Sequence, residues 1–296
     1  MAEAAENNQR SSRKNLPVPK GKLLSIGGKE DKGEQKTEVQ ADMKHFIDLE
    51  ILGRFVKELP GREPMVALVP TASTEPVAAV QDYRKVFEKL KLKNIEVVDI
   101  RNRLDTRKPE YAKIIEQAAG IMFTGGDQLR LTAILGGTPI LHLMKERYTF
   151  DPIIVGGTSA GAAAMSTPMI YEGETQGGMI KGDVRITTGL EFLKDVAIDT
   201  HFISRGRIIR MSQAIATNPS CIGIGLEEDT AILVSEGRNL EILGNGLVTV
   251  LDGMESTDTN IYKIGNGEPF TIRNLKIHLL GRGEKFVLPL FDQLHI

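Results

Sequence analysis

A serine among small residues is the first feature of this sequence that could do chemistry. Residues 157–161 read GTSAG, the G-x-S-x-G pattern of a nucleophilic serine at a tight turn between a strand and a helix. Small neighbours are needed there because larger side chains would collide with either element. An apolar run precedes Ser159 and an alanine-rich run follows it, which favours a nucleophile elbow. The alternative is a glycine-rich turn that binds phosphate or only joins two elements.

Backbone amides near this serine could stabilise an oxyanion. The N–H of Ala160 would lie at the start of a helix, where unpartnered N–H groups and the helix dipole favour negative charge. A second glycine-rich turn, FTGGDQ at 123–128, ends the preceding strand. Its glycines let an amide approach a substrate carbonyl, so Gly126 is the candidate for the second donor. Asp127 or Gln128 would cap the next helix or contact the substrate.

A nucleophilic serine needs a base, and the chain has five histidines. His201 follows an apolar strand into an expected loop, in VAIDTHF, and is therefore the best candidate for the base by position and by elimination. The other four lie in expected helices or in the C-terminal region, where a structural or solvated role is expected: His45, His142, His278 and His295.

The third member of such a site is a carboxylate that orients the imidazole. Glu228, after the strand CIGIGL, is the preferred acid. The sequence leaves four other carboxylates open: Glu227, Asp229, Glu172 and Glu174. The resulting order of serine, histidine and acid differs from the serine, acid and histidine order of α/β-hydrolases, which argues against that superfamily.

An arginine-rich run follows the candidate base. It contains Arg205, Arg207 and Arg210, and the last two are neighbours on a helix expected over 205–216. Guanidinium groups recognise carboxylates in a planar, bidentate way, so an acidic substrate is indicated. A solvated basic face is the alternative. Asp199, two residues before the histidine, could conversely hold a cationic group.

Hydrophobic periodicity predicts the elements that position these residues. From residue 22, short apolar runs alternate with helical periods, which predicts β-α-β-α-β up to residue 100, with the first helix over 41–59. The runs are continuous, as in parallel strands that helices cover on both faces. Further strands are expected at 119–126 and 152–157, with helices between them. In such sheets ligands bind beyond the carboxyl ends of the strands, so four loops should converge on one crevice: 27–31, 70–73, 124–128 and 156–161.

Beyond residue 196 the pattern changes. A strand, the helix over 205–216 and another strand are followed by short apolar runs with glycine-containing turns, which indicates an antiparallel extension. Ile208, Met211 and Ile215 should form the buried stripe of that helix. We therefore expect an α/β fold with a mostly parallel sheet. No linker is visible, so we expect a disordered polar tail over residues 1–20 and a single domain over residues 21–296.

Composition excludes several classes of function. The formal net charge of −2 offers no basic field for nucleic acid, and one cysteine cannot form an internal disulfide or a multi-cysteine metal site. The loop GGKED lacks both nucleotide-binding glycine patterns, so nucleotide binding is only weakly indicated. We expect no cofactor and no metal. No apolar stretch reaches the roughly 20 residues of a membrane helix, and the first 20 residues lack the apolar core of a signal peptide, so a cytoplasmic location is expected.

Four motifs in order, FTGGDQLRL, GTSAGAAAMS, DTHFISRGRIIRM and GIGLEEDTAIL, resemble the serine peptidase family of cyanophycinases and the α-aspartyl dipeptidases called dipeptidase E. The resemblance covers nearly all of the chain after the tail. It implies a flavodoxin-like fold related to class I glutamine amidotransferases, a triad of Ser159, His201 and Glu228, and usually a homodimer.

The arginine run favours the cyanophycinase branch of this family. That branch cleaves cyanophycin, a polyaspartate that carries arginine on its side chains, into β-Asp-Arg dipeptides. The resemblance implies substrate contacts from Gln128, Asp199, Arg205, Arg207 and Arg210. Thr200 departs from the family motif, which has glutamine there, so the substrate preference stays open. The alternatives are a di- or oligopeptidase of the dipeptidase E type acting on other acidic peptides, and a non-catalytic binding module of the same fold.

Overall fold

The larger of two main sheets carries the N-terminal half of the fold. The computed structural model describes residues 17–33, 46–173 and 177–289. Within these residues the sheet has the order β18-β13-β12-β1-β5-β4-β2-β3. The strands from β1 to β3 in this order are parallel, and β12, β13 and β18 extend them antiparallel. Their bounds are Lys22–Ile26 (β1), Met65–Val69 (β2), Asn94–Val97 (β3), Gly120–Phe123 (β4), Ile154–Thr158 (β5), Thr230–Ser235 (β12), Asn239–Gly244 (β13) and Lys285–Val287 (β18).

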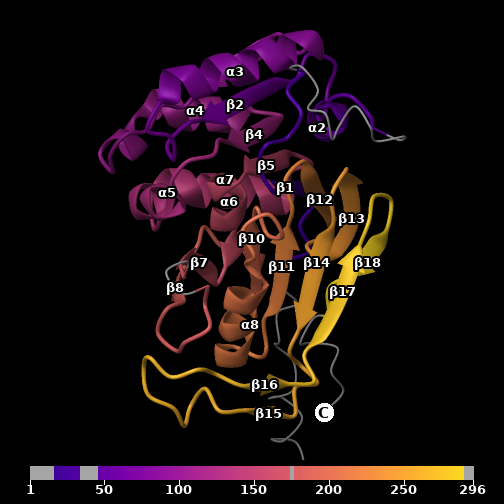
Figure 1. Cartoon of the computed structure of the whole chain (residues 1–296). Coiled ribbons are helices and arrows are strands. Elements are labelled where there is room, and N and C mark those ends of the chain that lie inside the picture. The colour runs from indigo at the N-terminus through magenta and orange to yellow at the C-terminus, as the bar shows by residue number, and fades with distance from the viewer. Residues whose placement is uncertain (1–16, 34–45, 174–176, 290–296) are drawn as a thin grey trace, which may run out of the picture.

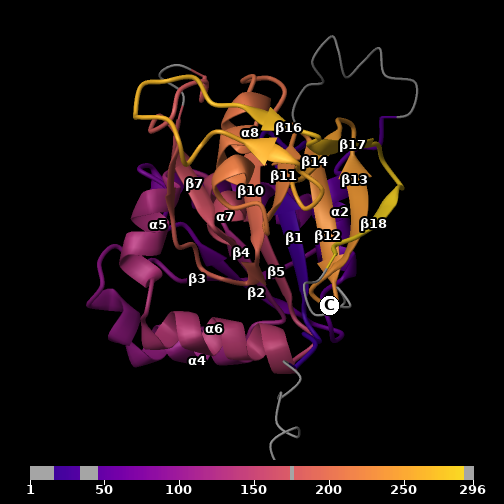
Figure 2. The ribbon, with the colours of Figure 1, turned by 90° about the horizontal axis from the view of Figure 1, so that it is seen from below.

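Helices cover both faces of this sheet (Figure 1). Because side chains alternate along a strand, Val66 and Leu68 of β2 pack toward one face, while Ala67 and Val69 pack toward the other. On the first face lie α2 (Glu50–Lys57) and α3 (Pro76–Lys89). On the second lie α4 (Pro109–Gln117), α5 (Gln128–Leu135), α6 (Pro139–Phe150) and α7 (Ala160–Ala164), with α4 beside α6 (Figure 2). Three of these helices begin with proline, whose fixed φ and missing N–H suit the first helical position.

A second sheet follows in the C-terminal half, with the order β17-β14-β11-β10-β6-β9 among the described residues. Its inner side shares one apolar cluster with the larger sheet, and α8 (Ile208–Thr217) packs on its other side through Met211 and Ile215. The bounds are Ser166–Thr167 (β6), Leu193–Lys194 (β9), Val196–Thr200 (β10), Ile222–Leu226 (β11), Val248–Asp252 (β14) and Lys276–Leu280 (β17). Short pairs complete the described part: β7 (Met169–Glu172) with β8 (Arg185–Thr187), β15 (Asp258–Thr259) with β16 (Ile272–Arg273), and a 3₁₀ turn at Asp105–Arg107.

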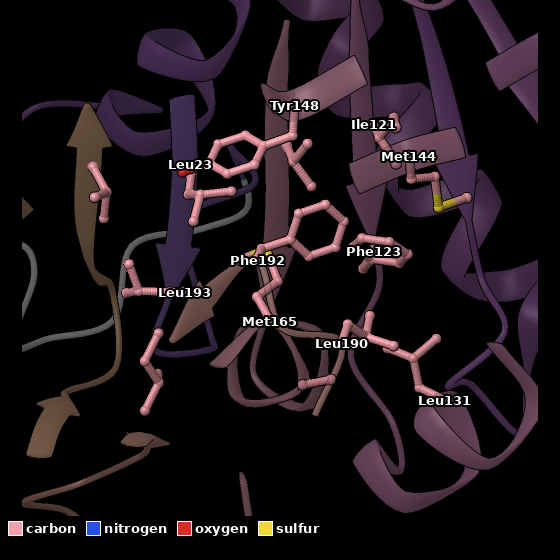
Figure 3. Packing of buried hydrophobic residues seen from close by; sticks show 14 of the residues in the cluster. Leu23, Ile121, Phe123, Leu131, Met144, Tyr148, Met165, Leu190, Phe192 and Leu193 are labelled. Atoms are coloured by element: carbon pink, nitrogen blue, oxygen red, sulfur yellow. The ribbon is translucent and has the colours of Figure 1, made fainter. Parts of the chain in front are cut away.

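The shared cluster is built around aromatic rings (Figure 3). The ring of Phe192 lies 5.7 Å from that of Tyr148 of α6 and 6.3 Å from that of Phe123 of β4, measured between centroids. Such edge-on and tilted pairs add to the free energy gained from burial. The segment before β9 is thereby packed against the larger sheet.

The predicted fold class is confirmed, with three differences in detail. The C-terminal strands divide between two sheets rather than only extending one. Of the helix expected over 41–59, the structure places α2 at Glu50–Lys57, and residues 41–45 lie outside the described part. Helix α8 begins at Ile208, three residues later than expected, after turns that include Gly206 at φ 61°. Ile208 is consequently 40% exposed, so its predicted place in the buried stripe is wrong.

Candidate active site

Ser159 lies in the sharp turn between β5 and α7. Its φ of 49° and ψ of −112° belong to neither element, as in a nucleophile elbow. A Cβ on Gly157 would lie 2.6 Å from the carbonyl carbon of Gly161, and one on Gly161 would lie 2.7 Å from the carbonyl oxygen of Phe123. Both contacts are too short for any side chain, so the turn requires these two glycines.

The end of β1 holds Ser159 and His201 side by side. The Ser159 N–H donates to Ile26 O at 2.9 Å, and the His201 N–H donates to Gly27 O at 3.1 Å. As a result His201 Nε2 lies 3.0 Å from Ser159 Oγ, within hydrogen-bonding distance. The imidazole also lies against Gly28, where an added Cβ would be 2.6 Å from Nε2. Gly28 therefore leaves the space that the ring occupies.

The three consecutive acidic residues after β11 have three different partners. Glu228 Oε1 lies 2.8 Å from His201 Nδ1, so it completes a line from serine to histidine to carboxylate. Glu227 accepts hydrogen bonds from two amides of the loop after the histidine, at 203 and 204. Asp229 accepts from the amide of Asp31 at 3.0 Å and from the side chain of Asn245 at 2.7 Å.

The other two candidate acids, Glu172 and Glu174, follow α7 in the sequence, and neither is seen to contact His201 in the described residues. Glu172 pairs with Arg185 at 3.1 Å, on the pair of short strands β7 and β8. Glu174 lies outside the described residues, as do His45 and His295. Among the described carboxylates, Glu228 is the one that contacts the imidazole of His201.

Glu228 also forms an ion pair with a lysine. Lys29 Nζ lies 2.9 Å from Glu228 Oε1, the same oxygen that faces His201. Partial burial would raise the pKa of Glu228, but the hydrogen bonds and charges of Lys29 and His201 outweigh it and hold the pKa below its ordinary value. The carboxylate is therefore ionised at neutral pH, as a group that stabilises an imidazolium must be.

The amide of Ala160 and the glycine-rich turn after β4 lie near Ser159. The N–H of Ala160 is the first of α7, and the first N–H groups of a helix have no intrahelical partner. The Cβ position of Gly125 lies 3.7 Å from Ser159 Cβ, so the turn that contains Gly126 runs beside the serine. A Cβ on Gly126 would lie 2.1 Å from Ala72 O, which brings the loop after β2 into the same place. The loops after β2, β4 and β5 therefore meet, as expected for loops at the carboxyl ends of parallel strands.

A polar cavity of about 400 Å³ lies beside this site. Four residues expected to bind substrate line it, namely Gln128, Arg205, Arg207 and Arg210. The other lining residues are Tyr171, Glu172, Gly173, Gly182, Asp183 and Arg185. The side chain of Gln128 donates to Ile170 O at 3.3 Å, while Asp127 caps α5 by accepting from the amides at 129 and 130. The cavity therefore offers both signs of charge.

The buried carboxylate of Asp199 pairs with two of the arginines. Its carboxylate is 3% exposed and accepts from Arg210 Nε at 2.6 Å and from Arg207 at 3.1 Å. Arg207 also donates to the carbonyl oxygen of Thr200 at 2.7 Å. Asp199 and Thr200 are not among the described residues that line the cavity. The cationic partner of Asp199 in this structure is thus the arginine pair itself.

Comparison with known proteins decides the family. The description "Peptidase family S51" matches residues 40–242, which include Ser159, His201 and Glu228. The chain belongs to Peptidase family S51. It is a serine peptidase.

Relatives of this S51 peptidase include several cyanophycinases. The cyanophycinase of Geminocystis herdmanii is 34% identical over 264 residues, 89% of this chain and 92% of the relative. That of Trichormus variabilis is also 34% identical, over 90% of this chain and 85% of the relative. Among solved structures, a peptidase from an acI-B1 Actinobacterium has the same fold at 21% identity and a TM-score of 0.64, over 92% of this chain and 99% of that one. A putative peptidase E from Listeria monocytogenes matches at 19% identity and a TM-score of 0.51, over 76% and 99%.

Several residues near the site of this S51 peptidase have no signal in the sequence that singles them out. Lys29 belongs to the loop 27–31, which is expected at the site because it follows the carboxyl end of a parallel strand. That expectation does not say which side chain of the loop contacts Glu228. Tyr171 and Arg185 lie on the short strands β7 and β8, whose apolar pattern is too short to be recognised. Their place at the cavity depends on the second half of the fold.

Proposed function

We propose that Ser159, His201 and Glu228 are the catalytic triad of a serine exopeptidase that hydrolyses the polyaspartate backbone of cyanophycin and releases β-Asp-Arg dipeptides. One observation carries the proposal. Ser159 Oγ lies 3.0 Å from His201 Nε2, and His201 Nδ1 lies 2.8 Å from Glu228 Oε1. These three side chains lie beside a cavity lined by arginines. The relatives named cyanophycinase support the choice of substrate.

The first half of the proposed reaction forms an acyl-enzyme. Ser159 Oγ attacks the carbonyl carbon of an aspartyl peptide while His201 Nε2 takes the hydroxyl proton. The negative charge that develops on the carbonyl oxygen is stabilised by the N–H groups of Ala160 and Gly126. His201 then gives the proton to the departing amine nitrogen, and the C–N bond breaks. Glu228 stabilises the imidazolium throughout and keeps its orientation.

The second half releases the acyl group. A water molecule enters the place of the amine and gives a proton to His201 as its oxygen attacks the ester carbonyl. The same amides stabilise the second oxyanion. When the C–O bond to Ser159 breaks, the proton returns from His201 to Oγ. The free acid leaves, and the enzyme is regenerated.

The cavity provides the chemistry that this substrate needs. Cyanophycin carries a carboxylate and a guanidinium on each side chain, and the cavity is lined by arginines as well as by Glu172 and Asp183. We propose that Gln128, Arg205, Arg207 and Arg210 contact the substrate. Asp199 acts behind them because its buried carboxylate fixes the guanidinium planes of the pair.

A second candidate follows from Thr200. Where the cyanophycinase motif has glutamine, this chain has a buried threonine next to Asp199. The loss of an amide at that place favours a relaxed preference, as in a di- or oligopeptidase that cleaves other acidic peptides with the same triad. Dependence of the rate on polymer length distinguishes the two candidates.

The deciding experiment uses insoluble cyanophycin. Purified wild type and Ser159→Ala are incubated with the polymer, and soluble products are identified by mass spectrometry. Release of β-Asp-Arg by wild type alone is the expected result. If wild type releases none but cleaves shorter aspartyl or isoaspartyl peptides in a Ser159-dependent way, the second candidate replaces the first. If Ser159→Ala keeps full activity, the triad is wrong.

We also propose a cytoplasmic homodimer. Members of the family that the sequence resembles are usually dimers, and a single cysteine suits a reducing compartment. Light scattering should give twice the 32.5 kDa of the chain, and fractionation of cells should recover the protein with the cytoplasmic contents. Among the described residues, no helix is both long enough and apolar enough to span a membrane.

A further inference from the structure

A second pocket is lined in part by Ser159, and the mechanism described above gives this pocket no role. Its volume is about 240 Å³, and the residues that matter here are Gly28, Lys29, Glu30, Lys32, Tyr83 and Ser159. We call it the Lys32 pocket. It is smaller than the roughly 300–1,000 Å³ of pockets that take a drug-sized ligand, so it suits one or two amino-acid residues.

The Lys32 pocket lies next to the nitrogen that would protonate the leaving group. The proton for the departing amine comes from His201 Nε2, so the leaving group must pass that nitrogen. Gly28 lines the pocket, and its Cβ position is 2.6 Å from Nε2. The arginine-lined cavity, in contrast, does not include Ser159 or Gly28 among the described residues that line it. The two spaces therefore suit the two sides of the scissile bond.

Buried hydrogen bonds hold the carboxylate of Glu30 in place, and this carboxylate positions the ammonium of Lys32. The side chain of Glu30 is 1% exposed and accepts hydrogen bonds from Tyr83 Oη at 2.8 Å and from Thr158 Oγ1 at 2.6 Å. Lys32 Nζ lies 3.5 Å from Glu30 Oε1 and 4.8 Å from the centroid of the Tyr83 ring. A carboxylate and an aromatic face together hold the ammonium over the pocket. Because Thr158 precedes Ser159 directly, the network ends at the proposed nucleophile.

The ammonium of Lys32 has donors left for a ligand. It carries three N–H groups, and its ion pair with Glu30 at 3.5 Å is longer than a good hydrogen bond. The side chain is 28% exposed, so a ligand can reach it. Lys29, at the same pocket, is already paired with Glu228. Lys32 is therefore the cation best placed to accept a carboxylate from outside.

We propose that the Lys32 pocket binds the departing residue by its free C-terminal carboxylate and that Lys32 makes this peptidase an exopeptidase. The inference rests on the proposed function, since it assigns the leaving side of the same reaction. A polymer interior presents an amide where the chain end presents a carboxylate. Each side chain of the polymer also carries a carboxylate, but only the chain end presents one on the backbone, so recognition of this backbone carboxylate by Lys32 directs cleavage to the last bond.

The test compares two substrates in three proteins. The substrates are a dimer of β-Asp-Arg and the same dimer with its backbone C-terminal carboxyl converted to an amide. The proteins are wild type, Lys32→Gln and the control Lys85→Gln, which removes an exposed charge paired with Asp82 at the pocket rim. Wild type and Lys85→Gln should prefer the free acid in kcat/KM by about ten- to a hundredfold, the range for one hydrogen bond to a charged group. Lys32→Gln should lose this preference by slowing only on the acid, and Lys32→Arg should keep most of it.

Other outcomes overturn the proposal. If Lys32→Gln lowers kcat/KM equally on both substrates, or on neither, Lys32 does not bind the terminal carboxylate. A binding measurement separates this result from a failure of the triad. In a Ser159→Ala background, calorimetry should show that Lys32→Gln weakens binding of the acid and leaves binding of the amide unchanged. That difference does not depend on chemistry at Ser159, so its absence contradicts the Lys32 pocket alone, and turnover by Ser159→Ala contradicts the triad alone.

Discussion

His201 is the residue on which the proposed chemistry depends most directly. Its imidazole lies between Ser159 Oγ and Glu228 Oε1, and in the proposed mechanism it serves as base and acid in turn. Since general acid–base catalysis is typically worth about 10² to 10⁴ in rate, His201→Ala should lower kcat by at least this factor. The measurement is steady-state hydrolysis of β-Asp-Arg dimers with a melting curve for each protein. His142→Ala, on an exposed position of α6, is the control and should match wild type. Ordinary turnover by folded His201→Ala would remove the base from the mechanism.

Lys29 offers a test of the charge around the triad. Its ammonium lowers the pKa of Glu228 and partly cancels the negative charge that faces the imidazole. In Lys29→Gln the pKa of Glu228 rises but the carboxylate stays ionised at neutral pH. Protonation of Glu228 on the acid side then begins at a higher pH, and a neutral carboxyl cannot stabilise the imidazolium, so the acid limb of kcat/KM moves to higher pH. Because the Lys29 side chain is 70% exposed and screened, the shift should be below about 0.7 pH unit.

The measurement for Lys29 is the pH profile at low and high salt. The difference between Lys29→Gln and wild type should shrink at high salt, since salt screens exposed charges. Lys85→Gln removes a charge outside the triad and should leave the profile in place. An acid limb that stays fixed or moves to lower pH in Lys29→Gln contradicts this role.

The acids after β11 show what a sequence can say about single residues. Residues 227, 228 and 229 are all carboxylates, so residue type cannot tell which of them orients the histidine. The structure separates them because Asp229 turns to φ 49° and the three side chains point to different partners. The serine and histidine were better determined, since their neighbours in sequence already specify a tight turn and a strand end. Lys29 and Lys32 were not predictable, because their roles come from contacts across the fold.

At the scale of elements, the turn from β5 to α7 is the part most sensitive to added volume. Gly157→Ala should force the two elements apart, because its Cβ would lie 2.6 Å from the backbone of Gly161. We expect loss of activity and a destabilisation of about 1–3 kcal/mol, the usual cost of overpacking. Activity and urea unfolding together measure it. Gly281→Ala is the matched control, because nothing lies within 4 Å of its Cβ position. A Gly157→Ala protein as active and stable as the control would show that the elbow tolerates a side chain.

Elements of the N-terminal half follow the hydrophobic pattern more closely than those of the C-terminal half. Continuous apolar runs and proline-initiated helices predict the parallel strands, and β1, β2, β4 and β5 are buried on both faces. The edge strand β3 is the exception, with Asn94 and Glu96 exposed. After residue 196 the runs are equally apolar, but the pattern does not say which strand pairs with which. β12 and β13 join the larger sheet, whereas β11 and β14 pair in the smaller one. Pairing between distant strands is decided by packing, which local sequence does not encode.

For the whole molecule, the shared apolar cluster predicts one cooperative unit over residues 21–296. Ile121 and Val155 of the larger sheet and Ile198 and Ile224 of the smaller sheet belong to the same buried cluster. If the sheets fold together, a cavity in either lowers the stability of both. Ile224→Ala should therefore shift a single unfolding transition by about 2–5 kcal/mol, the usual cost of truncating a buried isoleucine to alanine.

The measurement follows unfolding in urea by far-ultraviolet circular dichroism and by loss of hydrolytic activity. In wild type the two curves should coincide, as they do for a two-state domain. In Ile224→Ala both should move together, although the site residue Ser159 lies at the end of a strand in the other sheet. Ile121→Ala, in the larger sheet, should produce the same coincident shift. Two separate transitions, with Ile224→Ala moving only one of them, would divide the chain into two domains, and the loss of activity would then show which domain fails first.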